Sequence, residues 1–382
     1  MRVLFFTDSY FPQINGLVTS IDTVARALSQ RHRIWVIFPR AVTGVRYKKP
    51  YFTMGLLSIP FLLFPEYRIS FIFSFRVLVL LLKNRIDIIH THTFFSLGIM
   101  GLVFAKIFKI PLVHTYHTFF EEYLHYIKLS KKIGRKIVSW ISRLYCNQCD
   151  RIIVPTQMMK KVLWGYGVKK DIVVIPTGIP FKKYQQGDKR RLRKKMGIPL
   201  SSPVLLYVGR LAREKNIFFL LDCFREVCGQ YNQVYLFLLG DGPLKKDVRQ
   251  YIEKNKMDRI KLNGFVKQNE LKDIYATGNI FIFSSLTETQ GLVILEAMAA
   301  GLPVCAVAFR GTKYILPEKK IPGISPVNAN KKEMIREIIY YLENYRKKHN
   351  LFKTNLKKYI QPFSIEHTTA TLTDLYKSIL RQ

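Results

Sequence analysis

Short runs of β-branched and aromatic residues alternate with longer helical patterns along the whole chain. In the first half these runs are "RVLFFT", "RIWVIFP", "IDIIHTH", "IPLVHTYH", "RIIVPT" and "DIVVIPTG". Between the first two runs, Ile21, Val24, Ala25 and Leu28 recur at helical spacing within residues 19–30. Strands that alternate with helices predict an α/β fold with a parallel sheet covered by helices on both faces.

The alternation stops at a strongly basic, polar stretch, residues 182–197, and then begins again. The later runs are "PVLLYVGR", "VYLFLLGDG", "IKLNGFV", "IFIFSS" and "LPVCAVA". A chain of 382 residues exceeds the usual size of one hydrophobic core, so we expect two domains. The expected boundaries are 1–179 for the first domain, 180–362 for the second, and 363–382 for a separate helix that follows Pro362.

The charge balance predicts a polyanionic partner. The chain has 61 Lys and Arg residues against 26 Asp and Glu, a formal net charge of +35, and such a field attracts nucleic acid, nucleotide phosphates or an anionic membrane. No zinc-finger spacing, RNP-like aromatic pair or recognition helix supports a nucleic-acid-binding protein, so that alternative rests on charge alone. The basic run at 182–195 has few aromatics for base stacking, and we interpret it as a membrane-attracted or solvated loop.

The apolar segments predict neither a signal peptide nor a membrane span. The amino terminus, "MRVLFFTDSYFPQ", has too short an apolar run for a signal peptide, so we expect the mature chain to begin here. The most apolar region, residues 52–83, is interrupted by Pro60, Pro65 and Glu66, and no part of it approaches the ~20 residues that cross a bilayer. We interpret it as buried elements plus a surface that can touch lipid.

The five cysteines do not suggest a metal site. Only Cys146 and Cys149 form a C-x-x-C pair, and a zinc site would want a second pair nearby. We expect two partly buried helical residues, one turn apart, in a reducing cytoplasm.

Polar residues and glycines collect where the predicted strands end. In open parallel sheets, ligands bind beyond the carboxyl ends of the strands, so two domains with such residues at matching edges predict an enzyme with a cleft. His117 follows a strand that already carries His114, and a structural role for His117 is the alternative. The residues at strand ends are Gly16, His90, His92, His117, Gly178, Arg210, Gly240, Gly242 and Glu288.

Two loops of the second half are suited to a nucleotide. In "VGRLAREKN", Arg210 and Lys215 precede a helix, and cations beside a helix amino terminus favour a diphosphate. In "LLGDGP", Gly240 and Gly242 can let a base approach the backbone, although a plain tight turn is the alternative. Lys245 stands where a dinucleotide fingerprint needs its third glycine, which argues against a nicotinamide enzyme.

The stretch "SSLTETQGLVILEAMAAGLPVCAV" holds two acids around a strand-to-helix junction. Gly291 and Leu292 open the helix, with Glu288 before it and Glu296 one to two turns inside. The pattern favours glutamates that bind sugar hydroxyls while helix amides face phosphate; a helix cap plus a surface charge is the alternative. A glycosidase also uses two carboxylates, but it has no need for phosphate-binding groups such as Arg210.

Residues 128–144 predict a basic amphipathic helix. Its apolar stripe comprises Leu129, Ile133, Ile137, Trp140, Ile141 and Leu144, and its cations are Lys128, Lys131, Lys132, Arg135 and Lys136. Such a helix, with Trp140 at its margin, can lie in an anionic lipid interface. The alternative is a helix that turns its stripe to the core and its cations to solvent.

Together these motifs resemble glycosyltransferase family 4, whose GT-B fold has two Rossmann-like, doubly wound domains facing a cleft. "GLVTSI" resembles the first glycine loop, "VGRLAREKN" the phosphate-binding segment, "GDGPL" the base loop and "ETQGLVILEAMAAGLPV" the E-x7-E signature. "IHTHTFFSLG" and "PLVHTYHTFFEEYLHYI" are similar to bacterial diacylglycerol glycosyltransferases. Gln290 stands where family members commonly have an aromatic residue, and the segment after "CAVAFRG" lacks the usual acidic turn, which leaves the outer strand uncertain.

The resemblance implies retaining transfer of a hexose from a UDP-sugar, with no cofactor and no catalytic metal. Arg210 and Lys215 would hold the diphosphate, Glu288 the donor sugar and Glu296 the ribose. The helix opening at Gly291 and Leu292 and the loop of Gly240 and Gly242 would complete the donor site. His117 would lie beside the reacting carbon, and Gly16 would let its loop approach the donor phosphate.

The resemblance also implies the acceptor and the place of action. The acceptor would be the 3-hydroxyl of 1,2-diacylglycerol, and the sugar glucose or galactose; another lipid or a cell-envelope saccharide is the alternative acceptor. The enzyme would be peripheral on the cytoplasmic face of the cell membrane, where anionic lipids concentrate it through its charge. The last helix of the family crosses back, so we assign 363–382 to the first domain.

Overall fold

The computed structural model describes residues 1–13, 15–40, 48–60, 68–119, 121, 130–264, 266 and 270–382. The chain forms two compact units. Unit 1 comprises Met1–Gly178 together with Ile365–Gln382, and unit 2 comprises Ile179–Ser364. These limits lie within two residues of the boundaries expected from the sequence, and the terminal segment belongs to unit 1.

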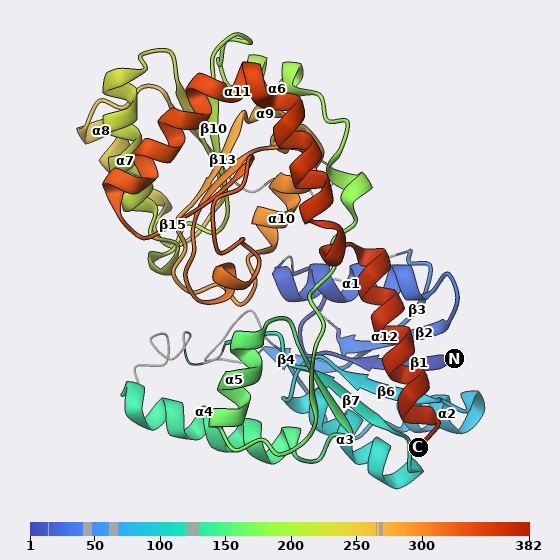
Figure 1. Cartoon of the computed structure of the whole chain (residues 1–382). Helices are drawn as coiled ribbons and strands as arrows, with labels where there is room; N and C mark the ends of the chain where they lie inside the picture. Colours follow the sequence, from blue (N-terminus) through green and yellow to red (C-terminus); the bar gives the residue numbers. More distant parts are fainter. Residues whose placement is uncertain are drawn as a thin grey trace. The chain divides into compact units, whose positions relative to one another are not determined.

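Unit 1 is built on a seven-stranded parallel sheet in the order β3-β2-β1-β6-β7-β8-β9 (Figure 1). The order reverses beside β1, whose neighbours are β2 and β6. The strands are β1 (Arg2–Phe6), β2 (Arg33–Pro39), β3 (Phe52–Leu56), β6 (Ile88–Thr91), β7 (Leu112–Thr115), β8 (Arg151–Val154) and β9 (Ile172–Val174), with a separate antiparallel pair, β4 (Ser58–Pro60) and β5 (Arg68–Ser70).

Helices cover both faces of this sheet. Alternate side chains of β1 point to opposite faces, so Leu4 and Phe6 join one apolar core and Val3 and Phe5 the other. The first core packs against α2 (Phe75–Asn84), α3 (Ser96–Phe108), α4 (Lys131–Cys146) and α5 (Gln157–Gly165). The second packs against α1 (Gly16–Leu28) and α12 (Ile365–Leu380).

The terminal helix α12 is fixed to unit 1 by close contacts. Thr368 Oγ1 donates to the carbonyl of Pro176 at 3.0 Å. A Cβ on Gly178 would lie 2.4 Å from Thr368 Oγ1, so only glycine lets the segment after β9 pass this close to α12. Tyr376, fully buried, reaches the ring of His90 with its hydroxyl, 2.6 Å from Nδ1.

Unit 2 is built on a six-stranded parallel sheet in the order β12-β11-β10-β13-β14-β15, the strand order of a Rossmann fold. Its strands are β10 (Val204–Val208), β11 (Tyr235–Leu239), β12 (Ile260–Asn263), β13 (Ile280–Phe283), β14 (Val304–Val307) and β15 (Ile324–Val327). Its helices are α6 (Lys189–Lys195), α7 (Ile217–Gln230), α8 (Lys245–Lys254), α9 (Leu271–Thr277), α10 (Leu292–Ala299) and α11 (Lys331–Tyr359), with short 3-10 turns η2 (Phe181–Tyr184), η3 (Arg213–Lys215), η5 (Arg310–Tyr314) and η6 (Gln361–Phe363).

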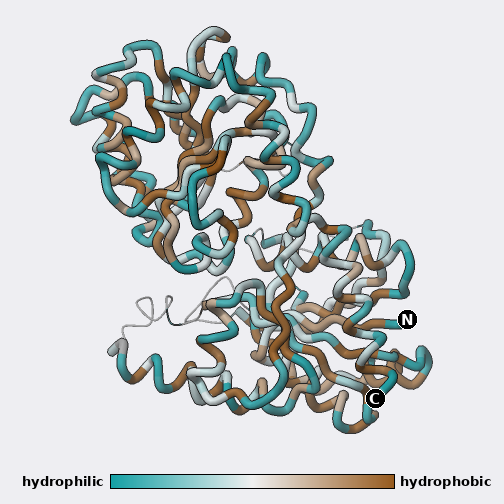
Figure 2. The backbone as a smooth tube through the Cα atoms, in the orientation of Figure 1, coloured by the Kyte–Doolittle hydropathy of each residue, from teal (hydrophilic) through white to brown (hydrophobic). Residues whose placement is uncertain are grey.

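The outer strand that the sequence left uncertain is β15, which pairs in parallel with β14. The central strands of both sheets are buried and mostly hydrophobic, as expected for strands covered on both faces (Figure 2), although β6 and β7 each end in a buried histidine and threonine. Among the described residues, no helix is long and apolar enough to cross a membrane.

The basic run at 182–195 is not a loop as its composition suggested, although most of its cations are exposed to solvent. It forms η2 and α6, and Tyr184 and Arg193 are buried. The guanidinium of Arg193 is a structural hub because it donates to several main-chain carbonyls and one side-chain amide. Its acceptors are Thr277 O, Pro199 O, Leu200 O, Ser202 O and Asn279 Oδ1.

Arg193→Met should lower the free energy of unfolding of unit 2 by about 3 kcal/mol, because several buried carbonyls lose their donors. Arg190→Met, an exposed position of the same helix, is the matched control and should change it by less than about 0.5 kcal/mol. Urea unfolding followed by circular dichroism measures both. Equal midpoints for the two variants would show that the hub does not stabilise the fold.

Candidate active site

In unit 2 the loops after β10 and β13 meet where the strand order reverses. Lys215 ends η3 after β10, and Glu288 lies in the loop after β13. Lys215 Nζ donates to Glu288 Oε1, and their side chains are only 19% and 16% exposed. Ser284 Oγ also donates to the carbonyl of Lys215 at 2.8 Å, which ties the two loops together. The fold thus brings together two of the predicted catalytic residues at the place where such sheets bind ligands.

The Glu288 loop is supported by a residue that sequence reasoning missed. Gly311 N donates to Glu288 O at 3.0 Å, and a Cβ on Gly311 would lie 2.2 Å from that oxygen. Any side chain at Gly311 would therefore displace the loop. Gly291, with φ +85, adopts the left-handed conformation that lets the loop turn into α10 at Leu292.

The predicted base loop packs on the loop that carries Arg210. A Cβ on Gly240 would lie 1.8 Å from Gly209 O, and a Cβ on Gly242 would lie 2.5 Å from Leu211 O. Contact between two backbones thus explains both glycines without a ligand, and their base-binding role stays a prediction. In the sequence Arg210 stands between Gly209 and Leu211, whose carbonyls make these contacts, and Arg210 is exposed.

Glu296 is buried in α10 and held by two tyrosines. Tyr184 OH donates to Oε1 at 2.9 Å, and Tyr275 OH donates to Oε2 at 2.6 Å. Burial raises the pKa of Glu296, and the two hydroxyl bonds oppose that rise. Because Glu288 is largely buried and Glu296 is buried, the alternative of a helix cap and a surface charge is wrong. Ribose binding by Glu296 stays a prediction, since a carboxylate oxygen can accept more than one bond.

In unit 1, four histidines gather at the carboxyl ends of β6 and β7. Nδ1 of His92 lies 2.9 Å from Nε2 of His117, and the ring of His90 stacks on His92 at 4.3 Å between centroids. His90 is fixed on its other nitrogen by Thr115 Oγ1 at 2.7 Å. His117 is therefore one member of a connected cluster, and sequence reasoning noted His92 only as a residue at a strand end.

Desolvation keeps this cluster uncharged. Burial lowers the pKa of His114 and of His117 to about 3, and lowers those of His90 and His92 well below the usual range. A neutral imidazole has one donor and one acceptor nitrogen, so the contact between His92 and His117 uses one of each. His117 can serve as a neutral hydrogen-bonding group at pH 7 and not as a cation.

The first glycine loop shows no steric need for glycine within unit 1. Gly16 is the first residue of α1, is exposed, and a Cβ there would meet nothing within 4 Å. Unit 1 itself does not require glycine at this position, so the close approach of a donor phosphate stays a prediction. Asp8, which sequence reasoning missed, accepts bonds from Ser96 Oγ at 2.6 Å and Leu97 N at 2.8 Å, and so joins the end of β1 to α3.

The amphipathic helix α4 exposes most of its apolar stripe, although Ile141 is partly buried against the core of unit 1. Ile133, Ile137, Trp140 and Leu144 are 56, 45, 56 and 47% exposed, so the alternative of a core-facing stripe is wrong. Lys132, Arg135 and Lys136 are exposed as well, and Lys131 begins the helix. Lys128 and Leu129 lie outside the described residues.

The cysteine pair differs from the expected helical pair. Cys146 is the last residue of α4 and Cys149 lies beyond its end, and both are fully buried rather than partly buried. In the part of the chain that the structure describes, no three His, Cys, Asp or Glu side chains are grouped so as to hold a metal ion.

The two units together define the GT-B class of sugar-transfer fold, and comparison with known proteins gives the family. Residues 14–183 match the family described as Glycosyltransferase Family 4, and residues 188–359 match Glycosyl transferases group 1. The crystal structure of Anabaena HepE in complex with UDP and glucose has a TM-score of 0.77 at 18% identity, over 99% of this chain and 100% of that one.

Two curated relatives are similar over most of their length. The α-monoglucosyldiacylglycerol synthase of Streptococcus pneumoniae is 35% identical over 82% of this chain and 72% of that protein. The enzyme of the same name from Acholeplasma laidlawii is 32% identical over 80% of this chain and 79% of that protein. The chain belongs to glycosyltransferase family 4.

The neutral histidines predict that the protein loses stability in acid. Between pH 6.5 and about 3, the unfolded chain protonates His114 and His117 while the folded chain does not. Stability is therefore fully present above pH 6.5 and falls as the pH falls, by up to about 1.4 kcal/mol per pH unit for each histidine. Thermal unfolding between pH 4.5 and 7.5 measures the slope. His114→Asn should make the slope shallower whatever its absolute stability; an unchanged slope would contradict the assignment.

Proposed function

We propose that the protein transfers glucose from UDP-glucose to the 3-hydroxyl of 1,2-diacylglycerol, forming a membrane glycolipid. The observation that carries the proposal is the similarity to two α-monoglucosyldiacylglycerol synthases over four fifths of the chain. The relatives' names favour glucose over galactose, which the motifs left open.

The donor half of this reaction rests on unit 2. Arg210 and Lys215 would bind the diphosphate of the donor, Glu288 its glucose and Glu296 its ribose. The Lys215–Glu288 pair supports this assignment because both side chains are largely removed from water and already adjacent. A diphosphate oxygen that approaches Lys215 can share the ammonium with Glu288, since an ammonium has three donors.

The reaction we infer keeps the anomeric configuration. UDP-glucose is itself an α-glucoside, and the relatives are named for an α-glucosyl product. The oxygen of the acceptor hydroxyl would attack C1 on the face that UDP leaves, the bond from C1 to the diphosphate would break, and a phosphate oxygen would take the hydroxyl proton. The main electrostatic task is to stabilise charge on the departing diphosphate, which falls to Arg210 and Lys215 without a catalytic metal or cofactor. His117 would contact the reacting sugar as a neutral hydrogen-bonding group.

A membrane-bound acceptor is supported by the surface of unit 1. The exposed stripe of α4 is flanked by the cations Lys132, Arg135 and Lys136, the combination that binds an anionic lipid surface. A second exposed apolar group lies in the segment after β5 and at the first residue of α2; it comprises Phe71, Ile72, Phe73 and Phe75. We infer a peripheral enzyme at the cytoplasmic face of the cell membrane, which anionic lipids hold at its substrate.

A transfer assay tests the function directly. Purified protein is given UDP-[14C]glucose or UDP-[14C]galactose with mixed micelles of diacylglycerol, with and without phosphatidylglycerol. Label should enter the lipid phase with UDP-glucose, and more of it when phosphatidylglycerol is present. No labelled lipid with either donor, from protein that binds UDP, would refute diacylglycerol as the acceptor and direct attention to other lipids or envelope saccharides.

Glu288→Gln should lower kcat of this transfer at least about a hundredfold, because a neutral amide no longer holds Lys215 or accepts strongly from the sugar hydroxyls. Glu253→Gln, an exposed glutamate of α8, is the matched control and should leave kcat within about twofold. Initial rates at saturating UDP-glucose and diacylglycerol measure both variants, and unchanged thermal unfolding confirms that they fold. Equal rates for the two would remove Glu288 from the site.

Replacing Ile137 and Trp140 together by serine should weaken binding to phosphatidylglycerol vesicles at least about tenfold, because each side chain loses roughly 1 kcal/mol or more of apolar burial. Leu351→Ser, at an exposed leucine of α11 in unit 2, is the control and should bind as the wild type does. Vesicle sedimentation measures the partition. Undiminished binding by the double variant would exclude α4 as the membrane contact.

A further inference from the structure

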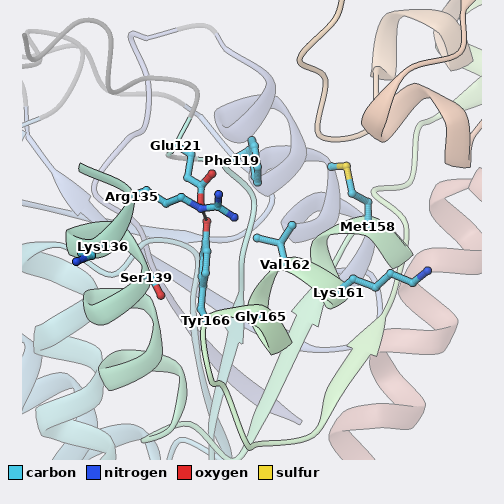
Figure 3. A pocket seen from close by; sticks show the side chains of 10 residues that line it. All are labelled: Phe119, Glu121, Arg135, Lys136, Ser139, Met158, Lys161, Val162, Gly165 and Tyr166. Carbon is cyan, nitrogen blue, oxygen red and sulfur yellow. Dashed lines mark hydrogen bonds and ion pairs between the residues drawn. The ribbon is translucent and has the colours of Figure 1, made fainter. Parts of the chain in front are cut away.

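A pocket of about 460 Å³ lies in unit 1 between α4, α5 and the segment that follows β7 (Figure 3). The segment after β7 supplies Phe119 and Glu121, and the other walls come from α4 and α5. Phe119 is two residues beyond His117, so one wall belongs to the segment that carries the predicted sugar contact. A pocket of this volume is typical of sites for small molecules.

The pocket has a polar centre built from three elements. Glu121 Oε1 accepts from Tyr166 OH at 2.5 Å and lies 3.1 Å from Arg135 Nε. Both contacts use the same oxygen, which leaves Oε2 able to accept from a ligand, as judged from the described residues. Burial and the Glu121 carboxylate raise the pKa of Tyr166, so its phenol stays a donor.

The rest of the lining favours an uncharged ligand with an apolar body. Phe119 and Val162 lie beside the polar centre, whereas the ammonium groups of Lys136 and Lys161 point away from it (Figure 3). Lys136 and Lys161 also line the pocket, but an anion at the polar centre would face the Glu121 carboxylate, which is already paired with Arg135. A hydroxyl group, in contrast, can donate to Glu121 and accept from Arg135.

The pocket borders the exposed stripe of α4. Arg135, Lys136 and Ser139 line the pocket. Lys136 lies four residues before the exposed Trp140, which belongs to the stripe. Residues three and four apart are neighbours on a helix surface, so the pocket wall borders the stripe. A lipid whose chains lie along the stripe can therefore place its polar end in the pocket.

We propose that this pocket receives the glyceryl end of the acceptor, with the free hydroxyl at Glu121 and Arg135 and the acyl chains along the stripe of α4. This inference rests on the proposed function, because that function supplies a neutral lipid alcohol as acceptor. The pocket volume of about 460 Å³ is of the order of a site for a small molecule, which suits the glyceryl end of a lipid.

Gly165 offers a way to fill the pocket without removing a contact. It lines the pocket as the last residue of α5, and a Cβ there would meet nothing within 4 Å. Gly165→Phe should raise the apparent KM for dioctanoylglycerol at least about tenfold and leave the KM for UDP-glucose unchanged. Gly229→Phe is the matched control: Gly229 is an exposed helical glycine of α7 that likewise has open space around its Cβ, and its variant should keep both KM values.

A second variant guards against misfolding of the first. Glu121→Gln keeps the shape of the pocket but weakens the acceptor for a ligand hydroxyl, and it should lower kcat/KM for dioctanoylglycerol about tenfold with UDP binding intact. Unchanged acceptor kinetics in both folded variants would overturn the proposal. So would variants that lose only the stimulation by phosphatidylglycerol, since the pocket would then serve an anionic lipid.

Photo-crosslinking separates failure of the pocket from failure of the proposed function. A short diacylglycerol that carries a diazirine on one chain is irradiated with the wild-type protein and with Gly165→Phe, and labelled peptides are mapped by mass spectrometry. Labels on α4 and α5 that disappear in the variant support the pocket even if no glucose is transferred. Labels confined to other elements overturn the pocket even if the wild type is an active glucosyltransferase.

Discussion

Parallel pairing of every strand in the two large sheets is the constraint on which the rest of the structure depends. Parallel neighbours need a crossover connection, usually through a helix, so all carboxyl ends of a sheet gather at one edge. At that edge the fold brings together residues that are distant in the chain: Lys215 and Glu288 in unit 2, and His92 and His117 in unit 1. Neither contact depends on local sequence, and both follow from the strand orders.

The features that sequence predicted well are those with a local signal. Strand and helix alternation, the glycines at loop turns and the polar residues after strands each have a periodicity or a position that can be read directly. Tyr184, Tyr275 and Arg193 had none, because their roles come from contacts across unit 2. The structural role of Arg193 was also missed because it lies in a run of cations, and such a run normally indicates a solvated surface.

Helix α4 shows why an amphipathic pattern leaves its own meaning open. An apolar stripe opposite cations has the same period whether the stripe meets a core or a lipid surface. Only the packing of neighbouring elements decides, and here Ile133, Ile137 and Trp140 remain exposed while Cys146 at the end of the helix is buried. Because α4 also supplies Arg135, Lys136 and Ser139 to the Glu121 pocket, its exposed apolar surface lies beside that pocket.

The two units divide the electrostatic work of the proposed transfer. In the proposed transfer unit 2 supplies Arg210 and Lys215. Glu288 already orients Lys215, so little reorganisation of Lys215 is needed when charge develops on the diphosphate. Unit 1 supplies histidines that burial holds neutral. In the proposed transfer a neutral His117 would bond to sugar hydroxyls, and its contact with His92 restricts the orientation of its ring.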